Sequence, residues 1–140
     1  MFQKITSFHK IFRHADWLTQ HAKIIEMNLH ITTKELKKEV AENINLLLVH
    51  FQTEWNGTCQ ILASVYEDLA HTYKGNTKFF TIDAEKNKTA MHEYGVMEIP
   101  TILFLKNGEV IDYVSGLAPK NIIISKIENA LTSANNKTFF

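Results

Sequence analysis

The sequence predicts a single α/β domain with a central mixed β-sheet flanked by helices, and one extra helix at the N-terminal end. Almost continuously apolar segments are followed by amphipathic helical patterns, as is typical of parallel strands joined by helices. Two later apolar segments flank Asn107 and Gly108, a dipeptide that favours a tight hairpin and hence an antiparallel end to the sheet. The 140 residues are enough for one such domain and too few for two.

The first element is predicted to be an amphipathic helix over residues 4–22. Its apolar residues recur at spacings of three and four, namely Ile5, Phe8, Ile11, Phe12, Ala15, Leu18 and Ala22. We expect this stripe to pack against the domain, or against a second copy to give a homodimer. A mitochondrial presequence is a weaker interpretation, because the segment has a single arginine and contains Asp16.

The sheet and its helices are predicted over residues 23–131, and residues 132–140 are expected to form a frayed tail. Strands are expected at 23–31, 44–51, 77–82, 101–106 and 109–115. Helices are expected after the candidate caps Thr32 and Thr33, at 58–73, at 85–94 and from Pro119 onwards. The last helix is expected to direct four residues inward, namely Ile122, Ile123, Ile127 and Leu131.

Composition narrows the function classes. Fifteen Lys and Arg balance fifteen Asp and Glu, so no net charge attracts the protein to nucleic acid or anionic lipid. The apolar runs, of about four residues, are far shorter than the roughly 20 needed to cross a bilayer. We therefore expect a soluble, cytoplasmic protein without a membrane association. The single cysteine, Cys59, cannot form an internal disulfide, which agrees with a reducing compartment.

Several motifs follow one another in a distinctive order. HFQTEWNGTC ends one predicted strand and TIDAE ends the next, before YGVMEIPTILFLKNGEV and Gly116. Over residues 23–131 the chain resembles the thioredoxin family. The resemblance implies the thioredoxin-like fold, a role in thiol–disulfide chemistry and cell redox homeostasis, and a groove for protein clients. The N-terminal helix and the tail lie outside the family's pattern.

Reduction of a protein disulfide needs two thiols three positions apart at the start of a helix. The first is exposed and ionised by the helix N-terminus, and the second resolves the mixed disulfide. The family's motif is WCGPC, whereas this chain has the active-site motif Trp55, Asn56, Gly57, Thr58 and Cys59. An amide occupies the attacking position, so we expect dithiol reductase activity to be absent.

Asn56 and Cys59 each allow two interpretations. Asn56 could cap the helix, because its side-chain oxygen can accept a hydrogen bond from an N–H two or three residues on, or it could orient a substrate thiol near Cys59. Cys59 could be a small buried hydrophobe. It could instead act as a monothiol that forms mixed disulfides with a protein or with glutathione, resolved by an outside thiol.

His50 stands where the family has a buried aspartate that accepts the proton of the resolving thiol. The resemblance puts it beneath Cys59, so these two residues are the candidate catalytic pair. The alternative is a neutral, hydrogen-bonded core histidine, because burial lowers the pKa of an imidazole. Phe79 replaces a family lysine near that position, which makes the surroundings more apolar.

Pro100 matches the cis proline of the family. In the family, this loop leaves the backbone before the proline free to pair with an extended client segment. The candidate client groove comprises Trp55, Met97, Ile99, Pro100, Thr101 and Gly116. Such a groove can bind a peptide without chemistry, so a redox-inactive module that binds a protein or peptide is the alternative function. Pro100 alone is equally explained as a rigid turn before the next strand.

No cofactor and no metal is expected. One cysteine cannot supply a thiolate cluster, and the seven histidines lack the tight spacing of metal ligands.

Overall fold

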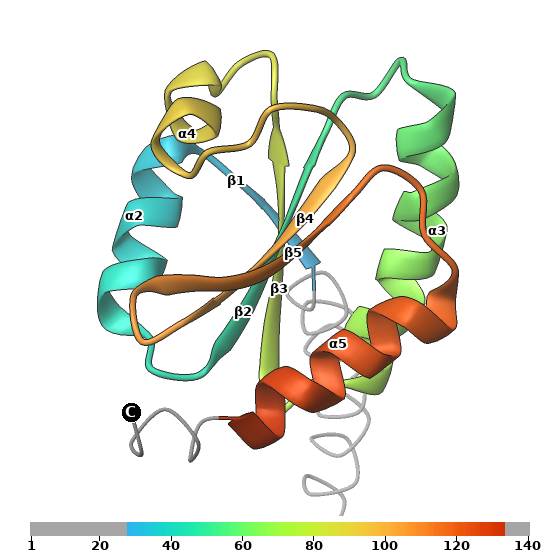
Figure 1. Cartoon of the computed structure of the whole chain (residues 1–140). Helices are drawn as coiled ribbons and strands as arrows, with labels where there is room; N and C mark the ends of the chain where they lie inside the picture. Colours follow the sequence, from blue (N-terminus) through green and yellow to red (C-terminus); the bar gives the residue numbers. More distant parts are fainter. Residues whose placement is uncertain (1–27, 134–140) are drawn as a thin grey trace, which may run out of the picture.

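The computed structural model describes residues 28–133, within which a five-stranded sheet carries two helices on each face (Figure 1). The elements in chain order are β1 (Asn28–Ile31), α2 (Thr33–Glu42), β2 (Leu46–Gln52), α3 (Gly57–Thr72), β3 (Thr77–Asp83), α4 (Lys88–Glu93), β4 (Thr101–Lys106), β5 (Glu109–Ser115) and α5 (Lys120–Thr132). Helices α2 and α4 cover one face, and α3 and α5 cover the other.

The sheet is mixed, with strand order β1-β3-β2-β4-β5. Strands β1, β3 and β2 run parallel, β4 runs antiparallel to β2, and β5 runs antiparallel to β4. The hairpin between β4 and β5 turns at Asn107 and Gly108, which adopt φ of 53° and 81°. The predicted α/β class and the antiparallel end of the sheet are confirmed.

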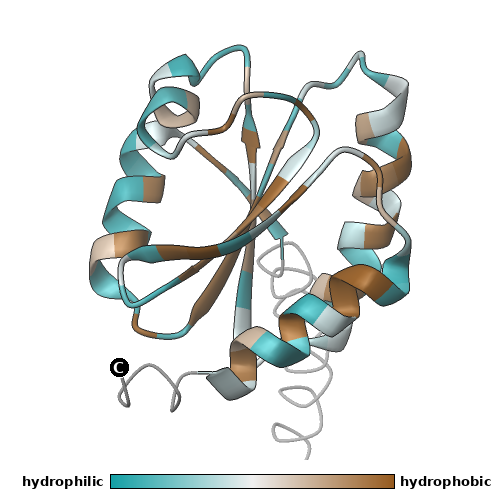
Figure 2. Cartoon of the chain, in the orientation of Figure 1, coloured by the Kyte–Doolittle hydropathy of each residue, from teal (hydrophilic) through white to brown (hydrophobic). Residues whose placement is uncertain are grey.

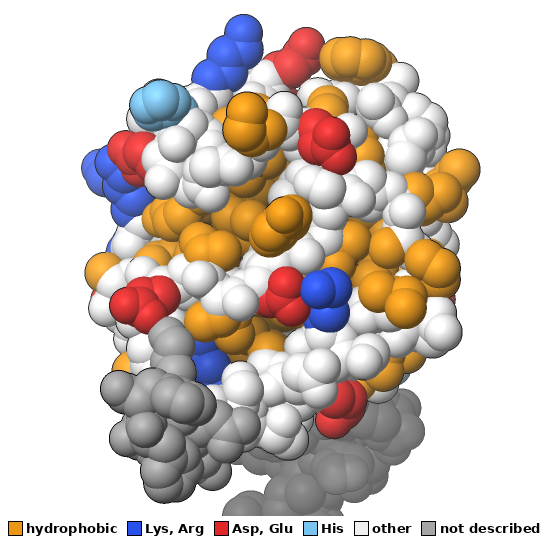
Figure 3. Space-filling model, viewed as in Figure 1, with side chains coloured by type: hydrophobic (Ala, Val, Ile, Leu, Met, Phe, Trp, Pro, Cys, Tyr) orange, Lys and Arg blue, Asp and Glu red, His pale blue; other side chains and the backbone are white. Residues whose placement is uncertain are grey.

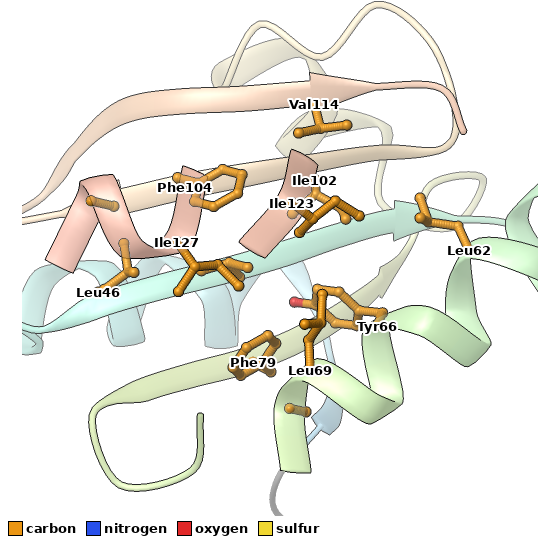
Figure 4. Close-up of a cluster of buried hydrophobic side chains, with 13 residues drawn as sticks. Leu46, Leu62, Tyr66, Leu69, Phe79, Ile102, Phe104, Val114, Ile123 and Ile127 are labelled. Atoms are coloured by element: carbon orange, nitrogen blue, oxygen red, sulfur yellow. The ribbon is translucent and has the colours of Figure 1, made fainter. Parts of the chain in front are cut away.

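Strand β2 is central, and its alternate side chains supply two hydrophobic cores. Leu46 and Leu48 belong to the core on the α3 and α5 side, where Tyr66 and Phe79 are also buried (Figure 4). The residues between them belong to the core on the α2 and α4 side, namely Leu47, Val49 and Phe51. In Figure 2 the strands accordingly carry brown stretches where they cross the middle of the sheet, and the helices alternate between brown and teal. The alternation puts His50 on the α3 and α5 side.

Helix α2 begins at one of the two predicted caps. The Thr32 hydroxyl accepts a hydrogen bond from the Glu35 N–H, and the Glu35 carboxylate accepts one from the Thr32 N–H. This reciprocal pair satisfies two backbone donors and defines the first turn. Thr32 is therefore the cap, and the prediction is confirmed for that residue.

Two predicted boundaries were wrong. Strand β2 begins at Leu46, and Ile44 is exposed ahead of it instead of starting the strand. Helix α4 begins at Lys88 instead of residue 85, because the Asp83 carboxylate accepts hydrogen bonds from the N–H groups of Glu85 and Lys86. That local turn competes with helix formation over the same residues.

The inward face of α5 also differs from the prediction. Ile123 and Ile127 are buried as expected, and Leu131 packs against the same core, but Ile122 is exposed and Ala130 is buried in the third turn. The helix continues to Thr132, the first residue of the predicted tail.

The predicted N-terminal helix over residues 4–22 and the tail from residue 134 lie outside the described residues. Within residues 28–133, no helix has the length and apolar character needed to traverse a bilayer.

Candidate functional site

Four loops meet at one end of the sheet. The strand registers pair Gln52 with Asp83, Phe51 with Thr101, and Thr101 with Ser115. The segments that follow β2, β3 and β5 and the segment that precedes β4 therefore share this end, which we call the loop edge. The topology thus brings the WNGTC motif, the TIDAE turn, the Pro100 loop and Gly116 together (Figure 1).

Asn56 is the N-cap of α3. Its backbone is extended, with φ of −93° and ψ of 120°, and its side-chain Oδ1 accepts a hydrogen bond from the Cys59 N–H at 3.0 Å. One of the otherwise unpaired donors of the first helical turn is satisfied in this way. The capping interpretation of Asn56 is confirmed, and the side-chain oxygen is already engaged.

Cys59 is the third residue of α3, and its exposed fraction is 0%. The thiol is free, and it lies beneath the first turn of the helix instead of at the surface. In this conformation no disulfide in solution can reach its sulfur, because thiol–disulfide exchange requires direct access to it.

His50 lies in the core at the other candidate position. It is fully buried, its ring centroid is 5.1 Å from that of Tyr66, and neither ring nitrogen has a hydrogen-bond partner among residues 28–133. Burial, and next the positive charge of His30, lower the pKa of His50 from 6.5 to about 4. The imidazole is therefore neutral at pH 7, and it makes no hydrogen bond to Cys59.

The neutral state agrees with the alternative interpretation of His50, but the hydrogen bond that this interpretation predicts is not formed with any described residue. A second buried polar group near this end of β2, the Thr53 hydroxyl, also has no partner among the described residues. Within residues 28–133, these two buried groups therefore share no hydrogen bond with the polar groups around the start of α3.

Trp55 is held at the surface of the loop edge. The side chain is 68% exposed, and its indole N–H donates a hydrogen bond to Glu85 Oε2 at 3.1 Å. The Gln60 amide donates to the Glu54 carbonyl oxygen at 2.6 Å, which ties the preceding residue to α3. These contacts orient a large apolar ring toward solvent.

The Pro100 loop is the neighbouring loop of the loop edge, because it leads into β4, which pairs with β2. The Ile99–Pro100 peptide bond is cis, Pro100 is buried, Ile99 is half-buried and Met97 is 92% exposed. The Thr101 hydroxyl donates to the Glu98 carbonyl oxygen at 2.6 Å.

The end of β5 is bonded to the same loop. The Gly116 N–H donates to the Pro100 carbonyl oxygen at 2.7 Å, at a φ of 76° that favours glycine. Among the described residues, no backbone hydrogen bond outside the regular elements involves Ile99, the residue before the proline.

Sequence reasoning missed Glu85 and Gln60, which hold the Trp55 segment in place. A signal for Glu85 was present. It stands two residues after the end of β3, and Trp55 stands three residues after the end of the neighbouring parallel strand β2. The carboxyl ends of neighbouring parallel strands meet at the same edge of a sheet. The predicted strand order was therefore enough to indicate that Trp55 and Glu85 lie close together.

The family model for thioredoxin matches residues 27–129. The chain belongs to the thioredoxin family. It is 35% identical over 97 residues to a thioredoxin of Chlorobaculum thiosulfatiphilum, covering 69% of this chain and 90% of that one. It is 34% identical over 102 residues to a thioredoxin of Rickettsia felis, covering 73% of this chain and 97% of the relative. Among solved structures, a mutant thioredoxin from Halobacterium salinarum superposes with a TM-score of 0.67 at 28% identity, covering 74% of this chain and 90% of that chain.

This member of the thioredoxin family has one cysteine in 140 residues, so it lacks the dithiol pair of the WCGPC motif. Among residues 28–133, no group of three His, Cys, Asp or Glu side chains converges to hold a metal ion. The roles of Cys59, His50 and the client-groove residues stay predictions.

Proposed function

We propose that this chain is a thioredoxin-family module that binds extended protein or peptide segments at the loop edge without dithiol chemistry. The observation that carries the proposal is the state of the WNGTC motif: an amide engaged as a helix cap stands at the outer position, and the only thiol is fully buried. Neither group can attack a disulfide from this conformation.

Binding is supported by what the loop edge exposes. Trp55 and Met97 present apolar surface on adjoining loops, and large exposed apolar side chains are typical of interaction sites. The backbone of Ile99 can supply an N–H donor and a C=O acceptor to an added strand. Together these features suit an extended client with apolar side chains.

The alternative is a monothiol that exchanges disulfides with a protein or with glutathione, resolved by an outside thiol. It requires the Cys59 sulfur to reach solvent, and a nearby cation or the N-terminus of a helix to stabilise the thiolate. The neutral imidazole of His50 does not supply that cation at pH 7. We therefore favour the binding module, and we propose the cytoplasm as its compartment because the lone thiol suits reducing conditions.

Native-state alkylation separates the two functions. Iodoacetamide labels a single site in this chain, so the ratio of the labelling rate of the folded protein to that in urea reports access to Cys59. The binding module predicts a ratio below about 0.01, because the thiol reacts only through opening of the fold. A ratio near 1 at pH 7 would support the monothiol.

Binding is tested with an immobilised, permanently unfolded protein whose cysteines are carboxymethylated, so that no disulfide is available. We expect Trp55→Ala to weaken binding about tenfold, because large aromatic side chains dominate interface energies. Ile44→Ala is the matched control, since Ile44 is 73% exposed ahead of β2, at the opposite end of that strand from the loop edge. Equal binding by both variants would refute the loop edge as the client site.

A further inference from the structure

Three glutamates lie on the loops of the loop edge. Glu54 precedes Trp55, Glu85 accepts its indole N–H, and Glu98 belongs to the Pro100 loop. All three residues are exposed. On the face shown in Figure 3, acidic side chains and a basic one lie among hydrophobic side chains at the end of the molecule where the loops gather.

The sheet order places these carboxylates on both sides of the apolar surface. Strand β2 leads into the Trp55 loop, and the Pro100 loop leads into β4. These two strands lie between β3 and β5 in the sheet. Glu85 follows β3 on one side. On the other side, Glu98 Oε1 is 4.0 Å from the position that a Cβ on Gly116 would occupy, so this carboxylate lies over the end of β5. A segment bound between Trp55 and Ile99 would pass between acidic groups.

The carboxylates of Glu54, Glu85 and Glu98 are free of cationic partners within the chain's described part. The ion pairs there use Glu93, Glu39, Asp68 and Asp112. Lys120, at the start of α5, is already paired with Asp68. The other nearby lysines, Lys86 and Lys88, belong to the β3–α4 turn and α4, so the Trp55 and Pro100 loops themselves carry negative charge only.

Resting on the proposed client binding, we propose that the clients are extended segments in which large apolar residues are flanked by lysine or arginine. The apolar residues would contact Trp55, Met97 and Ile99, and the flanking cations would reach Glu54 and Glu98. Exposed ion pairs contribute modestly to affinity, but complementary charge steers association and rejects partners of like charge. The three acidic side chains therefore select among clients that share the same apolar residues.

The test uses three fluorescent peptides with identical central leucines, flanked by two lysines, two glutamines or two glutamates on each side. Binding to the full chain is measured by fluorescence anisotropy at low and at high salt. We expect the lysine peptide to bind about tenfold more tightly than the glutamate peptide at low salt, with the glutamine peptide between them. High salt should narrow this difference, because the interacting charges are exposed.

A charge reversal localises the effect. Glu98→Lys should reduce the preference for the lysine peptide to less than about twofold, whereas Glu42→Lys makes the same change in net charge at an exposed position at the end of α2 and should leave the preference intact. Equal binding of the three peptides would overturn the charge selection while client binding stands. A failure of all three to bind would overturn the proposed function and this inference with it.

Discussion

The first turn of α3 and the strand end beneath it are built in opposite ways. In the turn, polar groups are partnered: Asn56 caps the Cys59 N–H, Gln60 holds the Glu54 carbonyl, and Trp55 donates to Glu85. Beneath it, neither ring nitrogen of His50 forms a hydrogen bond within the described part of the chain, and neither does the Thr53 hydroxyl. Among the described residues, the polar groups of the turn are therefore hydrogen-bonded, whereas these two buried polar groups of the strand end are not.

This difference bears directly on function. A partnered surface turn holds a helix start and an exposed tryptophan in one arrangement, which favours binding by preorganisation. An unpartnered neutral imidazole in an apolar core disfavours any charge beside it, because a buried charge without a partner is costly. The region therefore exposes an organised surface, and the neutral His50 beneath it does not stabilise a buried thiolate at pH 7.

The largest expected effect comes from restoring the missing thiol. Asn56→Cys places a sulfur at the N-terminus of α3, where the helix dipole favours a thiolate, three residues before Cys59. We expect insulin disulfide reduction, assayed with a thiol recycling system, to rise at least about tenfold above the wild-type background.

The matched control for that gain is Asn56→Cys combined with Cys59→Ser, which removes the resolving thiol and should return the rate to background. If Asn56→Cys alone shows no gain, the buried Cys59 and the neutral His50 prevent dithiol exchange even when both sulfurs are present.

The second expected effect concerns how the free energy of unfolding depends on pH. The pKa of His50 is about 4 in the folded state, below its ordinary value of 6.5. The stability that goes with keeping this imidazole neutral is therefore fully present above pH 6.5 and is lost as the pH falls toward 4. Over that window the folded state loses about 3 kcal/mol relative to the unfolded chain, which binds the proton more readily. Urea unfolding at pH 7 and pH 4 of the wild type and of His50→Leu measures this loss.

We expect His50→Leu to lose about 3 kcal/mol less than the wild type between the two pH values, because the titrating group is gone. His71→Gln, at an exposed position near the end of α3, is the control and should follow the wild type. A wild-type pH dependence in His50→Leu would show that the buried imidazole is not the group responsible.

The smallest effect concerns the cap. Asn56→Ala leaves the Cys59 N–H without its side-chain partner and should lower the free energy of unfolding by about 1 kcal/mol. Asn56→Ser keeps a capping oxygen and should retain most of that stability, as measured by urea unfolding at pH 7. Indistinguishable stabilities of the two variants would mean that the cap contributes nothing here.

Most of the fold was predictable because it depends on local patterns. The continuous apolar run of β2, the helical spacing in α3 and the positive-φ turn at Asn107 and Gly108 each indicate one structure from their own residues. The start of α4 was mispredicted because a side chain outside the helix, Asp83, binds the backbone over residues 85–86. Ile122 was wrongly predicted to face inward, because hydropathy alone does not determine the rotation of α5 about its own axis on the sheet.

The site was predictable in its residues and less so in their environment. The position of Asn56 before a helix predicts its capping role, and the structure agrees. The absence of a hydrogen-bond partner for His50 among residues 28–133 was not predictable, since it depends on Tyr66 and the other side chains that pack around the ring from other elements. The contact between Trp55 and Glu85 likewise joins residues 30 positions apart.

The order of residues along the chain was enough to establish the family, the helix cap and the loss of the second thiol, because each depends on residue identity at short spacing. Folding alone determined that Cys59 is inaccessible, that the His50 imidazole has no hydrogen-bond partner among residues 28–133, and that Glu85 contacts an exposed tryptophan. The burial of a side chain, its pKa and the charges near it depend on distances between segments that are remote in the chain. Only the packing of β2, β3, β4 and β5 against the helices sets those distances.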